Sequence, residues 1–203
     1  RLGIFAEPID PLLGQLQDIS ALLTLLNDSD FLVLDEAHSI GVLGERGRGA
    51  LEHFNIAAHP NVIRTGTFSK AFGAQGGFVI ASTEIVELIK DRSGSFKLST
   101  PLSPVACAAA RESIRLVSQS PETTVRQLHA NIHHTNQKLV ERGFEQFASN
   151  CVPIYHLPDG PAIRQLRETL PGKGLYLPSV KSYFAGICKI GLRWTIQAGH
   201  TSE

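Results

Sequence analysis

The sequence of 203 residues contains no methionine, only three cysteines, and no excess of charge of either sign. Arg1 stands where an initiator methionine would be, so we expect the sequence to be part of a longer, N-terminally truncated chain. Cys107, Cys151 and Cys188 are widely separated and form no CxxC pair. This scatter argues against a disulfide framework and against a zinc site, and it is typical of thiols in a reducing compartment.

Charge and hydropathy exclude further classes of protein. Nineteen basic residues balance nineteen acidic ones, so no overall field attracts the chain to nucleic acid or to an anionic membrane. No apolar run approaches the roughly 18 residues that a membrane-spanning helix needs, and residues 1–20 lack a signal-peptide pattern. With 42% hydrophobic and 19% charged residues, we expect a folded cytoplasmic protein of one large domain or two small ones.

The first half of the chain mixes helical and strand patterns, as α/β proteins do. Asp10-Pro11 and the leucine spacing that follows predict a helix over residues 10–26. Short apolar runs predict strands at residues 31–34, 62–65 and 77–81, of the kind that is covered on both faces in a parallel sheet. Ser82 or Thr83 then begins a helix that ends near Lys90.

The second half changes character at Ser103-Pro104, which predicts a helix running to about residue 118. Another helix is expected from Ser120-Pro121 to residue 142, ended by Gly143. Strands are expected at residues 152–156, 175–177 and 192–196, around a helix at 163–170. We therefore place one domain in residues 1–103 and a second, of linking helices and a smaller α+β domain, in residues 104–203.

A first chemical motif, Asp35-Glu36-Ala37-His38, follows directly on the predicted strand 31–34. Ligands of open α/β sheets bind beyond the carboxyl ends of the strands, so an aspartate here can point into a binding crevice. The alternative is a strand-end aspartate that only caps the next turn.

A second motif, Thr65 to Gly73, follows the next strand and contains Lys70 among small and apolar residues. We expect such a lysine to lose hydration, which favours the neutral, nucleophilic amine that Schiff-base chemistry requires. Thr67 and Ser69 add hydroxyl groups suited to a phosphate. Taken alone, Lys70 fits a solvated surface lysine better.

Together the two motifs fit pyridoxal 5′-phosphate. This cofactor needs a lysine for its aldehyde, an anion for its pyridinium nitrogen and small donors for its phosphate. Residues 35–44 and 66–73 also resemble the corresponding stretches of the α-oxoamine synthases, and residues 76–78, 99–104 and 192–201 agree with that family. The resemblance implies an aspartate-aminotransferase-like, fold-type I α/β protein with a mainly parallel sheet, whose activity condenses an amino acid with an acyl-CoA and releases carbon dioxide.

The resemblance also implies roles for matching residues of the cofactor site. Asp35 would pair with the pyridine nitrogen, His38 would bind the phenolic oxygen of the ring, and Thr67 would contact the phosphate. Lys70 would form the Schiff base and act as the catalytic base.

Thr100 resembles the residue that reaches the cofactor phosphate of a neighbouring subunit, which implies a homodimer with its site at the subunit interface. Arg193 resembles the arginine that binds the α-carboxylate of the substrate, a role that suits its planar fork. Residues 182–186 stand in place of a proline-rich turn, and Gly191 stands where a second arginine is common. These two departures leave the amino-acid and acyl specificity open. The family's N-terminal segment, with its cofactor-stacking histidine, is absent from the sequence, which suggests an excerpt and leaves a non-catalytic homologue as an alternative.

Three other patterns carry less weight. Asp35 to His38 also matches a helicase motif, but that function needs a GxxxxGK[ST] loop upstream, and residues 1–34 contain none. His129, His133 and His134 share a helical spacing, yet we expect a solvated helix face rather than a metal site. Residues 44–49, rich in glycine and arginine, are expected to form a flexible loop rather than a phosphate site.

Overall fold

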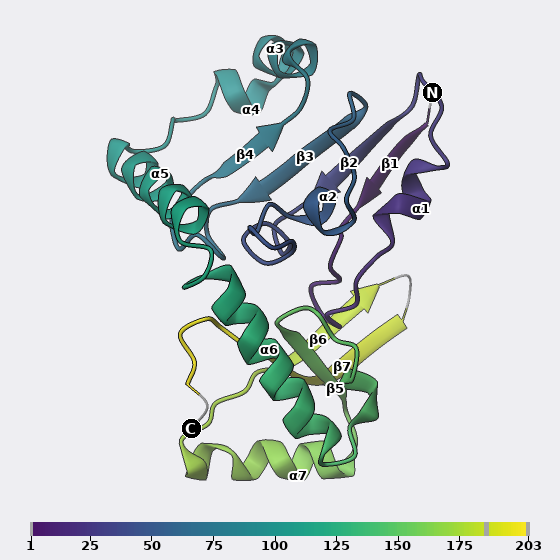
Figure 1. Ribbon diagram of the computed structural model, residues 1–203, viewed down its shortest axis with the longest axis vertical. Helices are drawn as coiled ribbons and strands as arrows, with labels where there is room; N and C mark the ends of the chain where they lie inside the picture. Colours follow the sequence, from purple (N-terminus) through teal and green to yellow (C-terminus); the bar gives the residue numbers. More distant parts are fainter. Residues whose placement is uncertain (1, 185–186, 202–203) are drawn as a thin grey trace. The chain divides into compact units, whose positions relative to one another are not determined.

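The computed structural model describes residues 2–184 and 187–201. The chain separates into two compact units, one of Arg1–Ile9 with Gln17–Gln127 and the other of Asp10–Leu16 with Leu128–Glu203. Each unit contains its own sheet (Figure 1). In the part of the chain that the structure describes, no helix has the length and hydropathy needed to cross a membrane.

The first unit is built on four strands that lie side by side in sequence order (Figure 1). They are β1 (Gly3–Ala6), β2 (Phe31–Asp35), β3 (Val62–Thr67) and β4 (Gly77–Ile80). β1, β2 and β3 are parallel, which confirms the predicted mainly parallel sheet, but β4 is antiparallel to β3. The expectation that β4 would match the other strands is wrong because residues 68–76 are too few for a parallel crossover, which needs roughly a dozen residues.

Most helices of the first unit begin at a residue whose side chain accepts a backbone hydrogen bond. They are α1 (Ile19–Leu23), α2 (Ala50–His53), α3 (Thr83–Arg92), α4 (Gly94–Lys97) and α5 (Pro104–Gln119), while α6 (Val125–Val140) continues into the second unit. The Ser82 side chain accepts a hydrogen bond from the Ile85 N–H, and the Ser103 side chain accepts one from the Ala106 N–H. Both predicted caps are therefore confirmed.

The predicted helix over residues 10–26 is wrong in its first half. Asp10 Oδ1 accepts hydrogen bonds from Leu12 N at 2.8 Å and Leu13 N at 2.7 Å, but these close a turn. Gly14 follows at φ +69°, and a Cβ at this position would lie 2.2 Å from the carbonyl oxygen of Ile154. Packing against β5 thus overrides the leucine periodicity, and α1 begins only after Asp18.

The second unit has an antiparallel sheet in the order β5 (Ile154–Pro158), β7 (Ile187–Thr195), β6 (Ser179–Phe184). Its remaining helices are α7 (Pro161–Thr169) and two single 3₁₀ turns, η1 (Glu145–Phe147) and η2 (Pro171–Lys173). The strand expected at residues 175–177 is absent: they precede β6, which begins after Pro178, a residue with no N–H to donate to a sheet.

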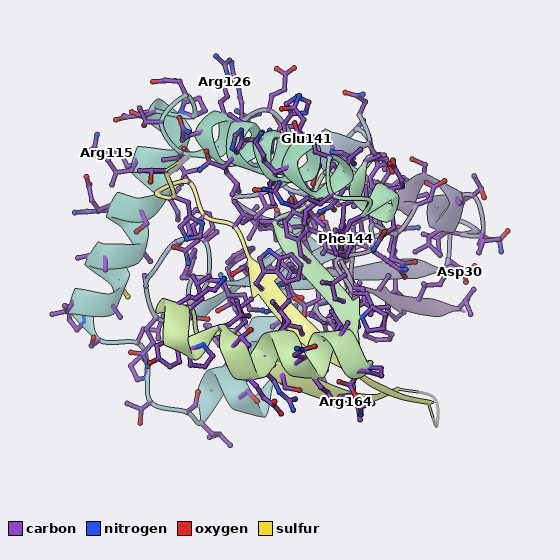
Figure 2. All side chains as sticks on the ribbon, turned by 90° about the horizontal axis from the view of Figure 1, so that it is seen from below. Asp30, Arg115, Arg126, Glu141, Phe144 and Arg164 are labelled. Carbon is purple, nitrogen blue, oxygen red and sulfur yellow. The ribbon has the colours of Figure 1, made fainter. Side chains whose placement is uncertain are left out.

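One face of this second sheet forms the core of the unit. Tyr155 and Trp194 are register partners whose rings stack at 5.3 Å. Phe144, beside the end of α6, and Ile163, on α7, pack against the same cluster, whereas Arg164 lies on the outer side of α7 (Figure 2). Because side chains alternate along a strand, Arg193 projects from the opposite face.

Candidate active site

The two motifs predicted from the sequence meet at one edge of the first sheet. β2 ends at Asp35 and β3 ends at Thr67, and Asp35 is the register partner of Thr65. Lys70 Nζ lies 2.9 Å from His38 Nε2, a hydrogen bond whose direction depends on the histidine tautomer. The loss of hydration expected for Lys70 is not seen, because this side chain is exposed.

The two loops can approach this closely because residue 41 is a glycine and has no side chain. Gly41 has φ +77°, and a Cβ at this position would lie 2.6 Å from the Cβ of Ala71, next to Lys70 in sequence. Any larger residue would push the lysine loop away from the loop that carries His38. The ring of Phe68 contacts those of Phe72 and Phe78, with centroids 5.8 and 5.1 Å apart, and these contacts hold the lysine loop from the other side.

Asp35 is exposed, and its Oδ1 accepts a hydrogen bond from Ala37 N at 3.0 Å. The turn-capping interpretation is therefore correct for one carboxylate oxygen. This bond fixes the orientation of the carboxylate at the strand end, where a cofactor nitrogen would have to approach.

Thr67 and Ser69 form a pair of hydroxyl groups beside the lysine. Their oxygens are 2.8 Å apart, and Thr67 Oγ1 also accepts from Ser69 N at 3.1 Å and donates to the carbonyl of Gly76 at 3.0 Å. Thr100 lies in the exposed segment before α5. That segment approaches the lysine loop through Leu102, whose Cδ1 would lie 2.5 Å from a Cβ at Gly76.

Glu36 is a residue whose importance the sequence reasoning missed. It is 0% exposed, and its carboxylate accepts hydrogen bonds from Ser39 Oγ, from Ala50 N at 2.9 Å and from Arg64 Nε at 2.7 Å. A signal did exist, because Glu36 continues the alternate spacing of the buried Leu32 and Leu34. A charged residue at a core-facing position requires a partner.

Residues 44–49 are more ordered than a flexible loop. Glu52 accepts hydrogen bonds from Arg46 N at 3.2 Å and from Arg48 N at 2.9 Å. Gly44, Gly47 and Gly49 all have positive φ. Glu52 thus binds the backbone of this loop, and Glu36 binds the N–H of Ala50 directly after it.

Arg193 belongs to the second unit, on β7. Its Nε donates a hydrogen bond to the carbonyl oxygen of Pro11 at 2.8 Å, and its side chain is half-buried. Burial lowers the pKa of the Arg193 guanidinium. This bond uses the Nε donor of the guanidinium. A carboxylate would therefore bind to the two terminal nitrogens.

Gly191 departs from the family pattern for a structural reason. A Cβ at Gly191 would lie 2.3 Å from the carbonyl oxygen of Leu157 and equally close to His156 Nε2. An arginine therefore cannot occupy this position without moving β5. Residues 185 and 186, part of the stretch predicted to replace a proline-rich turn, lie outside the described residues.

Asn131 on α6 is another residue that the sequence did not single out. Its Nδ2 lies 2.9 Å from the carbonyl of Gln197, 3.3 Å from that of Ala198 and 3.0 Å from that of His200. It thereby holds the end of the stretch 192–201 that carried part of the family resemblance.

Comparison with known proteins places this arrangement in a family. The sequence profile described as aminotransferase class I and II matches residues 13–203. The chain belongs to the aminotransferase class I and II family. It is 36% identical over 207 residues to the 8-amino-7-oxononanoate synthase of Geobacter sulfurreducens, an alignment that covers 98% of this chain and 52% of that protein. It is 34% identical over 175 residues to the enzyme of the same name from Hydrogenovibrio crunogenus, covering 85% of this chain and 44% of the relative.

Solved structures agree on the fold. The 8-amino-7-oxononanoate synthase of Francisella tularensis matches with a TM-score of 0.83 at 24% identity, covering 99% of this chain and 58% of the other. A serine palmitoyltransferase variant from S. paucimobilis, with a bound PLP–myriocin aldimine, matches with a TM-score of 0.84 at 25% identity, covering 99% and 51%. The predicted fold-type I class and the resemblance to α-oxoamine synthases are thus confirmed. The chain spans about half the length of the curated relatives it matches.

Proposed function

We propose that this chain holds pyridoxal 5′-phosphate and forms part of an enzyme that condenses an amino acid with an acyl-CoA, with loss of carbon dioxide, to give an aminoketone. The most specific form of the proposal is 8-amino-7-oxononanoate synthase, an enzyme of biotin synthesis. The 2.9 Å approach of Lys70 Nζ to His38 Nε2 carries the proposal, because it unites the two motifs on which the cofactor would depend. The names of the relatives support the choice of substrate.

The side chains present fit this cofactor by their chemistry. A primary amine, an imidazole, a carboxylate and two hydroxyl groups gather beyond the ends of β2 and β3, from Lys70, His38, Asp35, Thr67 and Ser69. Each has a matching group on the cofactor: aldehyde, phenolic oxygen, ring nitrogen and phosphate. These matches between side chains and cofactor groups support the proposal.

Pyridoxal phosphate, when bound, supplies a ring that accepts the electron pair released at the α-carbon of the amino acid. Asp35 would hold a proton on the ring nitrogen, and His38 would donate a hydrogen bond to the phenolic oxygen. Lys70 Nζ would take the α-proton of the amino acid. Arg193 would bind the α-carboxylate and orient the bond to be broken.

Two further proposals concern organisation. Thr100, exposed before α5, would reach the cofactor phosphate of a neighbouring subunit, so we expect a homodimer by analytical ultracentrifugation. Residues 1–103 would form part of the cofactor-binding large domain, with residues 104–203 supplying α5 and α6 as linking helices and the smaller C-terminal domain.

The proposal is tested by product analysis with the purified full-length protein. Pimeloyl-CoA with alanine should yield the aminoketone, whereas acetyl-CoA with glycine should yield little. The reverse preference would indicate 2-amino-3-ketobutyrate CoA ligase. Cofactor uptake without any turnover would instead indicate a non-catalytic homologue.

Serine palmitoyltransferase is the second candidate, because several structures of that enzyme match this chain at 25–26% identity with TM-scores of 0.82 to 0.84. Release of the product from palmitoyl-CoA and serine, at a rate above that with pimeloyl-CoA and alanine, would favour it.

A further inference from the structure

The most completely bonded polar group near the proposed site is the buried carboxylate of Glu36. One of its oxygens accepts from Ser39 Oγ and from Ala50 N, and the other accepts from Arg64 Nε. The Glu36 side chain is 0% exposed and that of Arg64 is 15% exposed. A charge so far from water is stable only with such partners, and removing one partner leaves the others unsatisfied.

These bonds fix the turn that carries His38. Ser39 N and Ile40 N both donate to the backbone carbonyl of Glu36 at 3.0 Å, while the Ser39 hydroxyl binds the Glu36 side chain. His38 is thus bracketed by a turn that is bound to Glu36 through backbone and side chain together. Ala50 begins α2, so the same carboxylate also fixes the far end of the loop.

Arg64 connects this turn to the strand that leads to the lysine. It lies on β3, which runs directly into the loop containing Lys70, and its terminal nitrogen donates to the carbonyl of Arg48. Gly49 is required here, since a Cβ would lie 2.3 Å from Glu36 Oε2 and 2.9 Å from Arg64 Nη2. The ion pair is therefore enclosed, and it connects the turn that carries His38 to β3.

We infer that Glu36 is a positioning residue, whose ion pair with Arg64 holds the turn that directs His38 Nε2 at Lys70 Nζ. The inference rests on the proposed function in one respect: it takes pyridoxal phosphate as the ligand whose binding Glu36 strengthens. Because Glu36 is 0% exposed, it acts through His38 rather than by direct contact with a ligand.

The test compares Glu36→Gln with Glu52→Gln as a matched control. Glu52 binds the backbone of the same loop through Arg46 N and Arg48 N, away from His38. Cofactor-free protein is titrated with pyridoxal phosphate, and the Kd and the absorbance maximum of the bound form are measured. We expect Glu36→Gln to weaken the Kd by roughly tenfold, as for one lost hydrogen bond, and Glu52→Gln to leave it nearly unchanged.

A double-mutant cycle with His38→Ala separates positioning from general destabilisation. If Glu36 acts through His38, then adding Glu36→Gln to His38→Ala should change neither the Kd nor the spectrum further. Additive losses, or equal losses in Glu36→Gln and Glu52→Gln, would overturn the inference. Should Glu36→Gln not fold, Ser39→Ala removes a single bond to the carboxylate and goes through the same cycle.

A cofactor-free measurement keeps the two proposals distinguishable. Nuclear Overhauser contacts between the His38 ring and the Lys70 side chain should be present in the wild-type protein and in Glu52→Gln, and lost in Glu36→Gln. If the wild-type protein takes up no pyridoxal phosphate, the proposed function is refuted. The contacts between His38 and Lys70 would still test whether Glu36 positions His38. Their persistence in Glu36→Gln would refute the positioning role.

Discussion

Arg193→Lys separates a structural role of this residue from a substrate-binding role. The native guanidinium donates from Nε to the carbonyl of Pro11 at 2.8 Å, and its terminal nitrogens lie further out on the fork. Lysine keeps the positive charge but has no donor at the Nε position and no planar fork. The substitution therefore removes the contact with Pro11 and would also remove the proposed contact with the substrate carboxylate, and each loss has its own measurable effect.

The hydrogen bond to the Pro11 carbonyl determines how much stability the substitution removes. A net hydrogen bond from a half-exposed charged group contributes about 1 kcal/mol, so the free energy of unfolding should fall by about that amount. The proposed contact to the α-carboxylate sets the kinetic loss. Breaking a charge-assisted pair costs about 2–5 kcal/mol when it is buried, and half-exposure places this pair near the lower end, which corresponds to roughly a 30-fold rise in KM.

The assay is steady-state kinetics with each substrate varied in turn, together with urea unfolding of the same preparations. We expect the KM for the amino acid to rise and the KM for the acyl-CoA to stay within about twofold, since the proposed role of the fork is to bind the carboxylate of the amino acid. An unchanged amino-acid KM with reduced stability would make Arg193 a structural residue only. A selective rise in the acyl-CoA KM would assign it to the thioester side of the site.

Three further predictions address the remaining residues. Borohydride reduction of the cofactor-loaded protein should label Lys70, and Lys70→Ala should bind pyridoxal phosphate weakly without turnover; a label on another lysine by peptide mapping would contradict the assignment. Asp35→Asn should lower turnover by orders of magnitude and cofactor affinity much less, because asparagine keeps an oxygen for Ala37 N but carries no charge; near-normal rates would leave Asp35 a turn cap. Burial raises the pKa of Tyr155 to about 12, above roughly 10 in the unfolded chain, so its stabilising contribution is present below pH ~10 and is lost as the pH rises through about 12. Tyr155→Phe should flatten that loss, measured by urea unfolding at about pH 8 and about pH 11, and an equally steep loss would contradict it.

Elements with a local cause were predictable from the sequence. Ser82 and Ser103 cap helices through side chains that reach three residues along the chain, and Gly143 adopts φ +86° after the end of α6. Such contacts involve near neighbours only, so the pattern of residues contains them. The start of α6 was less well predicted, because residues 121–124 form turns before Val125.

Elements determined by distant packing were not predictable. The leucines after Asp10 follow a helical period, but Gly14 approaches the backbone of Ile154 so closely that no helix can continue through it. Nothing near residue 14 reveals that approach. The direction of β4, by contrast, could have been predicted, since the short connection after Thr67 permits only an antiparallel return.

Within the site, too, some features follow from the local sequence and others depend on packing between distant residues. That Asp35 and Lys70 lie near each other follows from parallel strands ending at one edge of a sheet. The ion pair of Glu36 with Arg64 depends on the register between β2 and β3, and the contact of Asn131 with the end of the chain depends on tertiary packing. The alternate spacing of Leu32, Leu34 and Glu36 marks Glu36 as core-facing, but nothing in the sequence identifies Arg64 as its partner, and Asn131 has no such signal.

Structural and functional interpretations of these residues are not exclusive, because each polar group has more than one bonding position. A carboxylate offers two oxygens with about four lone pairs, so the bond from Ala37 N to Asp35 Oδ1 still permits a second partner. That bond restricts the rotation of the carboxylate, which would reduce the entropy lost if a ring nitrogen bound there. Arg193 is a similar case. Its Nε donates a hydrogen bond to the carbonyl of Pro11, and this bond orients the terminal nitrogens of the guanidinium. A turn cap and a strand anchor would therefore also serve a precise binding site at these positions, and the substitutions Asp35→Asn and Arg193→Lys distinguish the two roles.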